Sequence, residues 1–202
     1  MKKFLLLLLL AIFFLPVKAQ TADAVMSKVQ QDFSRAKNIK ADFVMSSSQM
    51  NAKGSILMSG KKFCVLTNDF KCWYDGKTQW IYSTATGEVN ILEPSLETLE
   101  LNNPYLAVMD YSANYNATLK SNGGNNYVVN LIAKNKSADI KNIQLKINKK
   151  NNRIIEVKAL MTDDDVQIIQ FSNYRINENI SSSAFVFDDK MIPKGTPIID
   201  LR

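Results

Sequence analysis

The chain of 202 residues has the length of one ordinary globular unit, with 46% hydrophobic and 22% charged residues. It contains no histidine, which excludes Ser-His-Asp and Cys-His catalysis, His-ligated zinc and imidazole acid–base chemistry. Two cysteines are too few for a Cys₄ metal site, and the glycines form no GxGxxG or GxxxxGK[ST] phosphate-binding motif. We therefore expect a binding protein without metal or cofactor, not an enzyme.

The first nineteen residues predict export. Lys2 and Lys3 precede an unbroken apolar run over residues 4–15, which is too short to span a membrane. Val17 and Ala19 occupy the −3 and −1 positions of a cleavage site before residue 20. This pattern is typical of a Sec-type signal peptide, with an uncleaved anchor as the alternative.

Cleavage would leave residues 20–202 as a single soluble domain in the periplasm. No cysteine lies near Gln20, so we expect no lipid anchor. The formal charge falls from +6 to +3, because three lysines and no acidic residue leave with the signal peptide. No basic cluster with interleaved aromatic residues is present, which disfavours nucleic acid, whereas the mild positive charge favours anionic membrane surfaces or acidic partners.

The mature chain opens with a helix that leads into a strand. Val25, Val29, Phe33 and Ala36 recur with helical period over residues 22–37. From Ile39 onward the apolar period changes to two, which predicts a strand.

Two antiparallel meanders follow, separated by a short helix over residues 104–111 that begins at Asn103-Pro104. Residues 95–101 remain ambiguous. Asp75-Gly76 predicts a two-residue type I′ hairpin turn. The strands are expected at 54–59, 62–67, 70–75, 78–83 and 88–93, and then at 115–120, 126–133, 141–148, 153–161 and 166–176.

The fold class is therefore α+β, mainly antiparallel β, with about ten or eleven strands and two or three helices. A sheet of this size must curl or close, and so few helices can cover only one of its faces. A strongly curved sheet with helices as a lid would enclose a hydrophobic cavity. A core fully packed by side chains is the alternative.

Several segments, in order, resemble the periplasmic outer-membrane lipoprotein carrier family, LolA. They include Ile39-Lys-Ala-Asp-Phe43, the Gly54 strand that leads to Lys62-Phe63, and the Glu93-Pro94 strand end. The most specific is Tyr74-Asp-Gly-Lys-Thr-Gln-Trp80-Ile-Tyr82, which is similar to the family's DGK-x-x-W-x-Y hairpin. The tail also resembles the family's C-terminus, with Phe185-Val-Phe187 and Pro193-Lys-Gly195-Thr-Pro-Ile-Ile-Asp-Leu-Arg202.

The resemblance implies an incomplete β-barrel that holds the acyl chains of a lipoprotein. Such carriers take lipoproteins from an inner-membrane ABC transporter to the outer membrane, and here the acceptor is unknown and a monomer is expected. The alternative is an envelope lipid-sensing or protein-interaction module on the same fold. Proteobacterial carriers use an arginine after the Gly54 equivalent to hold the lid closed, but this chain has no arginine between Arg35 and Arg153. Lys61 and Lys62 are the nearest basic residues, so a different lid contact is expected.

Eleven apolar residues are candidates to line the cavity, because they lie on apolar faces near the expected mouth. Plain core packing explains each of them equally well. They are Val25, Val29, Phe33, Phe43, Met45, Ile56, Met58, Trp80, Tyr82, Leu106 and Met109.

Cys64 and Cys72 are candidates for a disulfide. A hairpin turn centred on Asn68 would place them directly opposite each other, and an exported protein can keep such a bond. Two separate buried thiols are the alternative.

Overall fold

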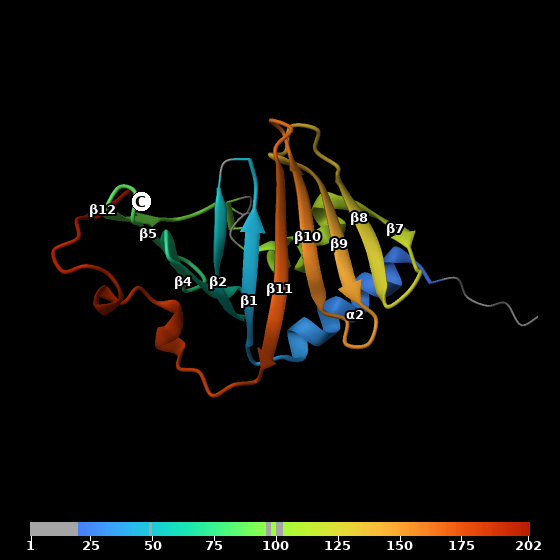
Figure 1. The fold of residues 1–202 in the computed structure, drawn as a ribbon, viewed down its shortest axis with the longest axis horizontal. Coiled ribbons are helices and arrows are strands. Elements are labelled where there is room, and N and C mark those ends of the chain that lie inside the picture. The colour runs from blue at the N-terminus through green and yellow to red at the C-terminus, as the bar shows by residue number, and fades with distance from the viewer. Residues whose placement is uncertain (1–19, 49, 96–97, 100–102) are drawn as a thin grey trace, which may run out of the picture.

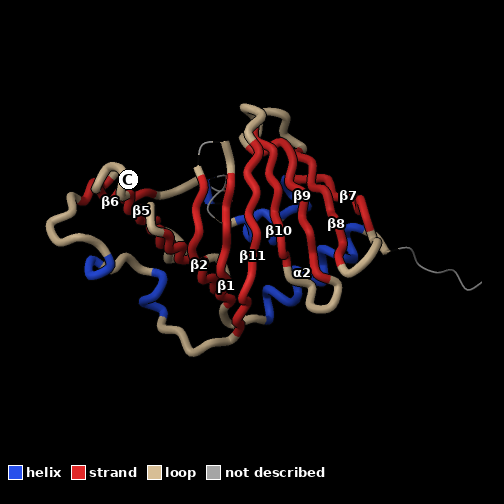
Figure 2. Tube along the Cα trace, in the orientation of Figure 1, coloured by secondary structure: helices blue, strands red, loops and turns tan. Residues whose placement is uncertain are grey.

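A computed structural model describes residues 20–202, except residues 49, 96–97 and 100–102. The predicted signal peptide lies outside the described residues, as does most of the ambiguous segment 95–101. The described chain forms one mixed sheet of twelve strands, with helices packed against one of its faces (Figures 1 and 2).

Helix α2 (Ala22–Arg35) forms where the helical apolar period predicts it. The Thr21 hydroxyl caps its first turn by accepting a hydrogen bond from the Ala24 amide at 3.1 Å. Val25, Val29 and Phe33 are buried along one stripe against the sheet. The helix ends at Arg35, two residues earlier than expected.

The strands confirm the predicted α+β class and number twelve in the described chain, where ten or eleven were expected. The sheet order is β12-β6-β5-β4-β3-β2-β1-β11-β10-β9-β8-β7, antiparallel throughout except for the parallel pair β12 and β6. The strand bounds are β1 (Ile39–Ser46), β2 (Asn51–Ser59), β3 (Lys62–Thr67), β4 (Phe70–Tyr74), β5 (Gln79–Ser83), β6 (Glu88–Leu92), β7 (Tyr115–Ser121), β8 (Asn126–Ala133), β9 (Ile140–Asn148), β10 (Ile154–Met161), β11 (Val166–Ile176) and β12 (Ile198–Asp200).

The sheet does not close, because β7 and β12 are its two edges. Figure 1 shows α2 crossing the far side of strands β8 to β11, on the same side as α4 (Pro104–Met109) and α5 (Tyr111–Asn114). We call this helix-bearing side the inner face and the other side the outer face. Most buried residues form one core between the inner face and these helices.

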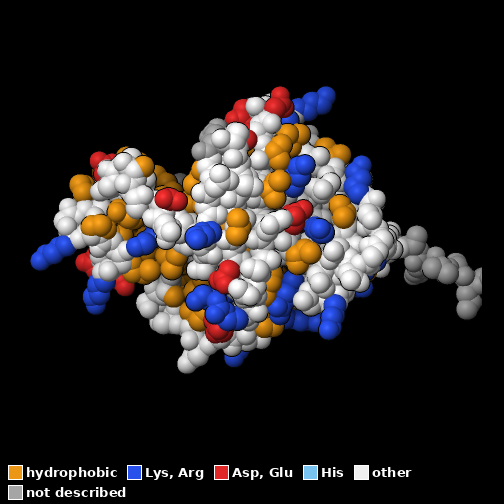
Figure 3. All heavy atoms as spheres, in the orientation of Figure 1, with side chains coloured by type: hydrophobic (Ala, Val, Ile, Leu, Met, Phe, Trp, Pro, Cys, Tyr) orange, Lys and Arg blue, Asp and Glu red, His pale blue; other side chains and the backbone are white. Residues whose placement is uncertain are grey.

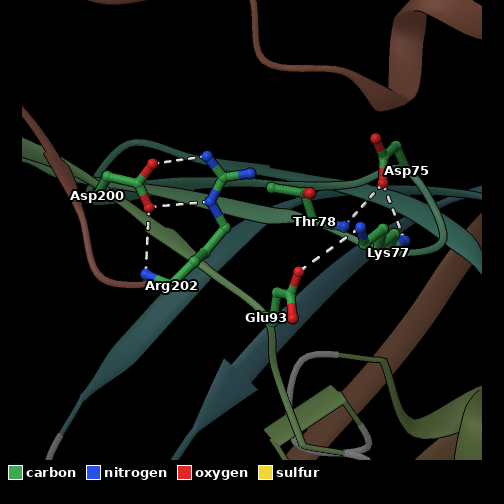
Figure 4. A network of polar contacts seen from close by, with 6 residues as sticks. All are labelled: Asp75, Lys77, Thr78, Glu93, Asp200 and Arg202. Carbon is green, nitrogen blue, oxygen red and sulfur yellow. Dashed lines mark hydrogen bonds and ion pairs between the residues drawn. The ribbon is translucent and has the colours of Figure 1, made fainter.

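The β4–β5 hairpin corrects the expected turn. Its loop has four residues, Asp75 to Thr78, because Tyr74 pairs with Gln79. Gly76 has a positive φ of 104°, whereas Asp75 does not, so the type I′ expectation is wrong. The Asp75 carboxylate instead accepts hydrogen bonds from the amides of Lys77 and Thr78, both at 2.9 Å (Figure 4).

The C-terminal segment, residues 177–202, crosses the outer face and is called the strap. It contains the short 3₁₀ helices η2 (Ser182–Phe185) and η3 (Asp189–Met191) and ends in β12. Its end is reinforced by an ion pair between Arg202 and Asp200 at 2.6 Å, near the Lys77–Glu93 pair (Figure 4). A second, smaller core forms beneath the strap from residues of β3 to β6 and from Phe187, Met191 and Ile192.

Candidate functional site

The inner face holds an apolar cavity of about 330 Å³ over strands β11, β1, β2, β3, β4 and β5. Phe43 and Met45 of β1 and Ile56 of β2 lie in its wall. The rest of the lining is mostly apolar and consists of Met50, Val65, Phe70, Ile81, Gln167, Ile169 and Phe171. Strand alternation explains the arrangement, since every second side chain of each strand points to this face.

Two further cavities flank the C-terminal end of α2, of about 490 and 310 Å³. They share Phe33 and Ala36 in their walls. The larger is completed by Tyr74, Leu99 and helix α4, and the smaller by Tyr105, Tyr174 and the β9–β10 turn. Side chains therefore do not completely fill the space around the C-terminal end of α2.

A row of buried side chains separates the first cavity, of 330 Å³, from the second, which is the cavity of 490 Å³ beside α2. Met58 pairs with Phe63, and Phe63 pairs with Tyr74, in adjacent strands. The first cavity lies over the next row, Ile56 and Val65, whereas Tyr74 lines the second cavity. Met58 and Phe63 are fully buried, and Met58 is unbranched and therefore one of the more adaptable side chains of this row.

The structure brings seven of the eleven sequence candidates to these cavity walls. Phe43, Met45 and Ile56 line the first cavity, of 330 Å³. Phe33, Leu106 and Met109 line the second, of 490 Å³. Val29 lines the third, of 310 Å³, together with Phe33. Val25 and Met58 are core residues that line none of the three.

Trp80 and Tyr82 are corrections, because both lie on the outer face. Trp80 pairs with Trp73 and Tyr82 with Lys71, and all four belong to or border the core beneath the strap. Ile81 between them points to the inner face and lines the first cavity. Strands β3 to β5 have buried residues on both faces, and in β5 the outer face carries Trp80 and Tyr82 whereas the inner face carries Gln79, Ile81 and Ser83. The apolar alternation of β5 therefore favours the wrong face as the one toward the cavity.

The sequence candidates did not include six apolar residues in the wall of the first cavity, namely Met50, Val65, Phe70, Ile81, Ile169 and Phe171. Ile169 and Phe171 could have been found from the alternation of β11, whose partner β1 places Phe171 opposite Phe43.

Helix α4 is fastened to α2 by hydrogen bonds. The Gln30 side-chain amide donates to the carbonyls of Val108 and Met109, at 3.1 and 2.9 Å. The Tyr111 hydroxyl donates to Asp23 at 2.7 Å, which ties α5 to the start of α2. The three helices therefore form one connected lid.

A pair of tyrosines fastens this lid to the sheet. The hydroxyls of Tyr105 in α4 and Tyr174 in β11 lie 2.6 Å apart, and Tyr174 donates to the Ile154 carbonyl. Burial raises the pKa of Tyr105 to about 12 and that of Tyr174 well above its ordinary value, so both carry their protons at neutral pH. These contacts hold the lid without an arginine in β1 to β9.

The expected Cys64–Cys72 disulfide is wrong. Cys64 pairs with Trp73 and Cys72 with Val65, one residue away from the predicted register. Neighbouring registers place side chains on opposite faces, so Cys64 belongs to the outer core and Cys72 to the inner core. Both are free thiols.

A larger cavity, of about 800 Å³, lies on the outer face between the sheet and the strap. Leu57, Leu66 and Trp73 line it from the sheet, and Val186 and Phe187 from the strap. Lys40, Glu178, Asp188 and Asp189 add charges to its wall. It is separated from the three inner cavities by the sheet itself.

Among the described residues, no group of three or more His, Cys, Asp or Glu side chains could hold a metal ion. No helix in that part of the chain has the length and apolar character that a membrane crossing requires.

The protein is therefore an open, curved sheet with helices over one face and with cavities, lined largely by apolar side chains, on that same face. The family described as outer membrane lipoprotein carrier protein LolA matches residues 13–161, which is more than half of the chain. The protein belongs to this family. A comparison with curated proteins finds no match.

The chain is similar to several solved structures at low sequence identity. An uncharacterized conserved protein from Thermus thermophilus is 12% identical with a TM-score of 0.59, over 89% of this chain and 98% of that one. A DUF1329 family protein from Desulfovibrio piger is 12% identical with a TM-score of 0.50, over 85% and 99%. A LolA superfamily protein from Nitrosomonas europaea is 13% identical with a TM-score of 0.46, over 84% and 99%.

Proposed function

We propose that this protein is a non-enzymatic periplasmic carrier that shelters the acyl chains of lipoproteins against the inner face of its sheet. The observation that carries the proposal is the mostly apolar 330 Å³ cavity on the inner face with two further cavities beside α2, together with membership in the lipoprotein carrier family. Seven of the sequence candidates lie in their walls. The chemistry of the walls suits hydrocarbon, because burial of apolar surface is favourable and non-directional.

The energetics require direct handover of the cargo. A triacylated lipoprotein has roughly 45 methylene groups, whose exposure to water would cost on the order of 35 kcal/mol at about 0.8 kcal/mol each. Non-covalent affinity saturates near about 18 to 21 kcal/mol, so no carrier could wait for spontaneously released cargo. We propose that an energised inner-membrane transporter loads the protein and that an acceptor at the outer membrane unloads it.

The proposal includes the processing of the chain. Residues 1–19 would be removed as a signal peptide, and residues 20–202 would act as a single, unlipidated domain and as a monomer. Each inner cavity has a volume near the lower half of the range for small-ligand pockets, about 300 to 1,000 Å³. Three acyl chains therefore require the cavities to join, which a shift of the Met58–Phe63 row and of the lid would allow.

Uptake of a fluorescent fatty-acyl probe by the purified protein tests the binding step, with native mass spectrometry to detect lipid that co-purifies. Met45→Trp adds volume inside the first cavity and should lower probe uptake several-fold. Val44→Trp is the matched control, because Val44 is the neighbouring residue of β1 on the outer face and is 57% exposed. Circular dichroism would verify that both variants fold.

Absence of both lipid and probe uptake in the unsubstituted protein would overturn the proposal and favour a sensor or interaction module on this fold. The transport step is tested in the source cell. Depletion of the protein should make acylated lipoproteins accumulate at the inner membrane, and an unchanged distribution would contradict a carrier role.

A further inference from the structure

The charges of the sheet are divided between its two ends. The turns β2–β3, β4–β5, β7–β8 and β9–β10, the C-terminus of α2 and the end of β11 all lie at one end, which we call the basic end. Its cations are Arg35, Lys37, Lys40, Lys61, Lys62, Lys77, Lys120, Lys149, Lys150, Arg153, Arg175 and Arg202, and its acids are Asp32, Asp75, Glu93, Asp110, Glu178 and Asp200. Figure 3 shows Lys and Arg side chains gathered at the lower end of the molecule.

The opposite end has the reverse balance. Its turns and strand ends carry the acids Asp69, Glu88, Asp139, Asp163, Asp164 and Asp165 against the cations Lys53, Lys134, Lys136 and Lys141. Figure 3 shows acidic side chains at the top of the molecule, where the β10–β11 turn lies. The charge of the protein is therefore distributed unevenly along its strands, with an excess of cations at one end and of acids at the other, although the net charge is small.

Most acids at the basic end are already engaged. Glu93 pairs with Lys77, Glu178 with Arg175, and the Asp75 carboxylate accepts two backbone hydrogen bonds. Among the described residues, no ion pair involves Lys61 or Lys62, and both are exposed. Their positive charge is available to a partner.

Two of the three inner cavities open at the same end. Lys61 lies in the wall of the 490 Å³ cavity, and Arg35 and Arg153 lie in the wall of the 310 Å³ cavity. Ile176 also lines the smaller cavity and is 46% exposed, so an apolar side chain stands among the cations. Asp110 and Asp32 also line these openings, but cations outnumber acids over the basic end as a whole. Openings with apolar side chains at a positively charged end match a bilayer surface, where anionic headgroups lie directly above hydrocarbon.

We propose that the basic end docks on an anionic phospholipid bilayer and turns the two cavity openings toward its acyl region. The long aliphatic stems of Lys and Arg can lie along apolar surface while their charged ends meet phosphate groups. A bilayer fits better than an acidic protein surface because the cations are spread over four turns and one helix end, around apolar openings. The acidic opposite end would face away, so electrostatic attraction selects one orientation.

Binding of the cargo-free protein to vesicles tests this interaction. The probe is a phosphatidylcholine vesicle containing phosphatidylglycerol, at low and at physiological salt, with cosedimentation as the readout. We expect binding that grows with phosphatidylglycerol content and weakens with salt, because charges beyond about 8 Å are screened at physiological ionic strength. The double variant Lys61→Gln, Lys62→Gln should bind about 25-fold more weakly, from about fivefold for each charge near the surface.

The matched control is Lys134→Gln, Lys136→Gln, which removes the same charge from the opposite end. We expect it to bind nearly as the unsubstituted protein does. Equal losses in the two variants would show that net charge and not the basic end governs binding, and would overturn the proposal. So would a lack of binding to phosphatidylglycerol vesicles at low salt, in which case an acidic protein surface would be the partner.

Orientation provides an independent readout. A polarity-sensitive fluorophore on Ser34→Cys, beside the larger opening, should shift its emission on vesicle binding. The same fluorophore on Ser48→Cys, at the opposite end, should not, and equal shifts would overturn the proposal. The unsubstituted protein controls for labelling of the two buried native thiols. Vesicle docking and acyl-probe uptake are measured separately, so failure of one does not imply failure of the other.

Discussion

Cys64 and Cys72 illustrate, at the scale of single residues, how one step of strand register decides the chemistry open to two side chains. Directly opposite each other, they could have formed a disulfide, whereas the observed pairing places them on opposite faces. Burial raises the pKa of each thiol to about 12. Each therefore behaves as a small apolar side chain and not as a nucleophile.

Alkylation of the two thiols should be slow in the folded protein. At pH 8 a thiol with a pKa near 12 has about one molecule in ten thousand as thiolate, against about one in four for an ordinary cysteine. We expect iodoacetamide to modify neither cysteine of the native protein over a time in which both react in denaturant without reductant. Mass spectrometry gives the count, and failure of the denatured, unreduced protein to take up two groups would indicate a disulfide.

The same pKa shifts predict the sign of a pH dependence. The thiols are held neutral in the folded state, so their contribution is fully present below the unfolded pKa of about 8.5 and is lost as pH rises toward 12. The free energy of unfolding should fall over this range, by at most about 1.4 kcal/mol per pH unit for each thiol. Cys72→Ala should reduce the slope, and an unchanged slope would contradict the assignment.

At the scale of elements, the lid depends on a few polar contacts set in apolar surroundings. Tyr105 stacks on Phe33 of α2 with ring centroids 5.3 Å apart and meets Phe171 of β11 edge-on at 6.0 Å. Its hydroxyl ends in the hydrogen bond to Tyr174. The aromatic contacts supply most of the attraction, and the hydrogen bond fixes where along β11 the helix sits.

A double-mutant cycle on Tyr105 and Tyr174 should show coupling. Tyr174→Phe leaves the buried Tyr105 hydroxyl without its partner, so we expect a loss of about 1 to 3 kcal/mol in the free energy of unfolding. Tyr105→Phe should cost less, because Tyr174 keeps the Ile154 carbonyl as acceptor. The double variant should be less destabilised than the sum of the two single variants, and additive losses would show that the hydroxyls do not interact.

Periodicity predicted almost every element, since α2 and eleven strands need only their own apolar pattern to be located. It did not predict β12, whose three residues pair in parallel with β6 from a distance of more than a hundred residues. Periodicity also could not show which side chains of β3 to β5 point to the inner face and which to the outer face. Phe63, Cys64 and Val65 are consecutive and all buried, because the lid covers one face of the sheet and the strap covers the other.

This limit explains which parts of the site were predictable. The candidates on α2 and β1 are all buried or nearly so, because one face of each element is polar and marks the other as buried, and all of them except Val25 lie in cavity walls. Trp80 and Tyr82 were misplaced because both faces of β5 lie against apolar residues. The lid contacts of Gln30 and Tyr174 depend on residues 78 and 69 positions away, which no local pattern shows.

On the scale of the whole molecule, one sheet serves two separate apolar layers. The inner layer contains the three cavities and is covered in part by α2, α4 and α5, whereas the outer layer is covered by the strap. The strap is held by β12, by the Lys71 side chain that donates to the Met191 carbonyl, and by Phe187 against Trp73 at 5.5 Å. Strands β3 to β6 are therefore supported from the outer face by contacts that do not involve the lid.

Because the two apolar layers are separate, we expect a substitution in the outer layer to leave acyl-probe binding in the inner layer unchanged. Phe187→Ala removes the ring that meets the edge of Trp73, so we expect a loss of about 1 to 3 kcal/mol in the free energy of unfolding, less than for a fully buried phenylalanine. Trp73 emission should shift to the red as water reaches it, while uptake of an acyl probe stays within error of the unsubstituted protein.

Val186→Ala is the control, because Val186 is the residue before Phe187 and is 42% exposed, and it should change the free energy of unfolding by less than about 0.5 kcal/mol. A folded Phe187→Ala variant that no longer takes up the probe would show instead that strap and cavity are coupled, and that the strap takes part in loading.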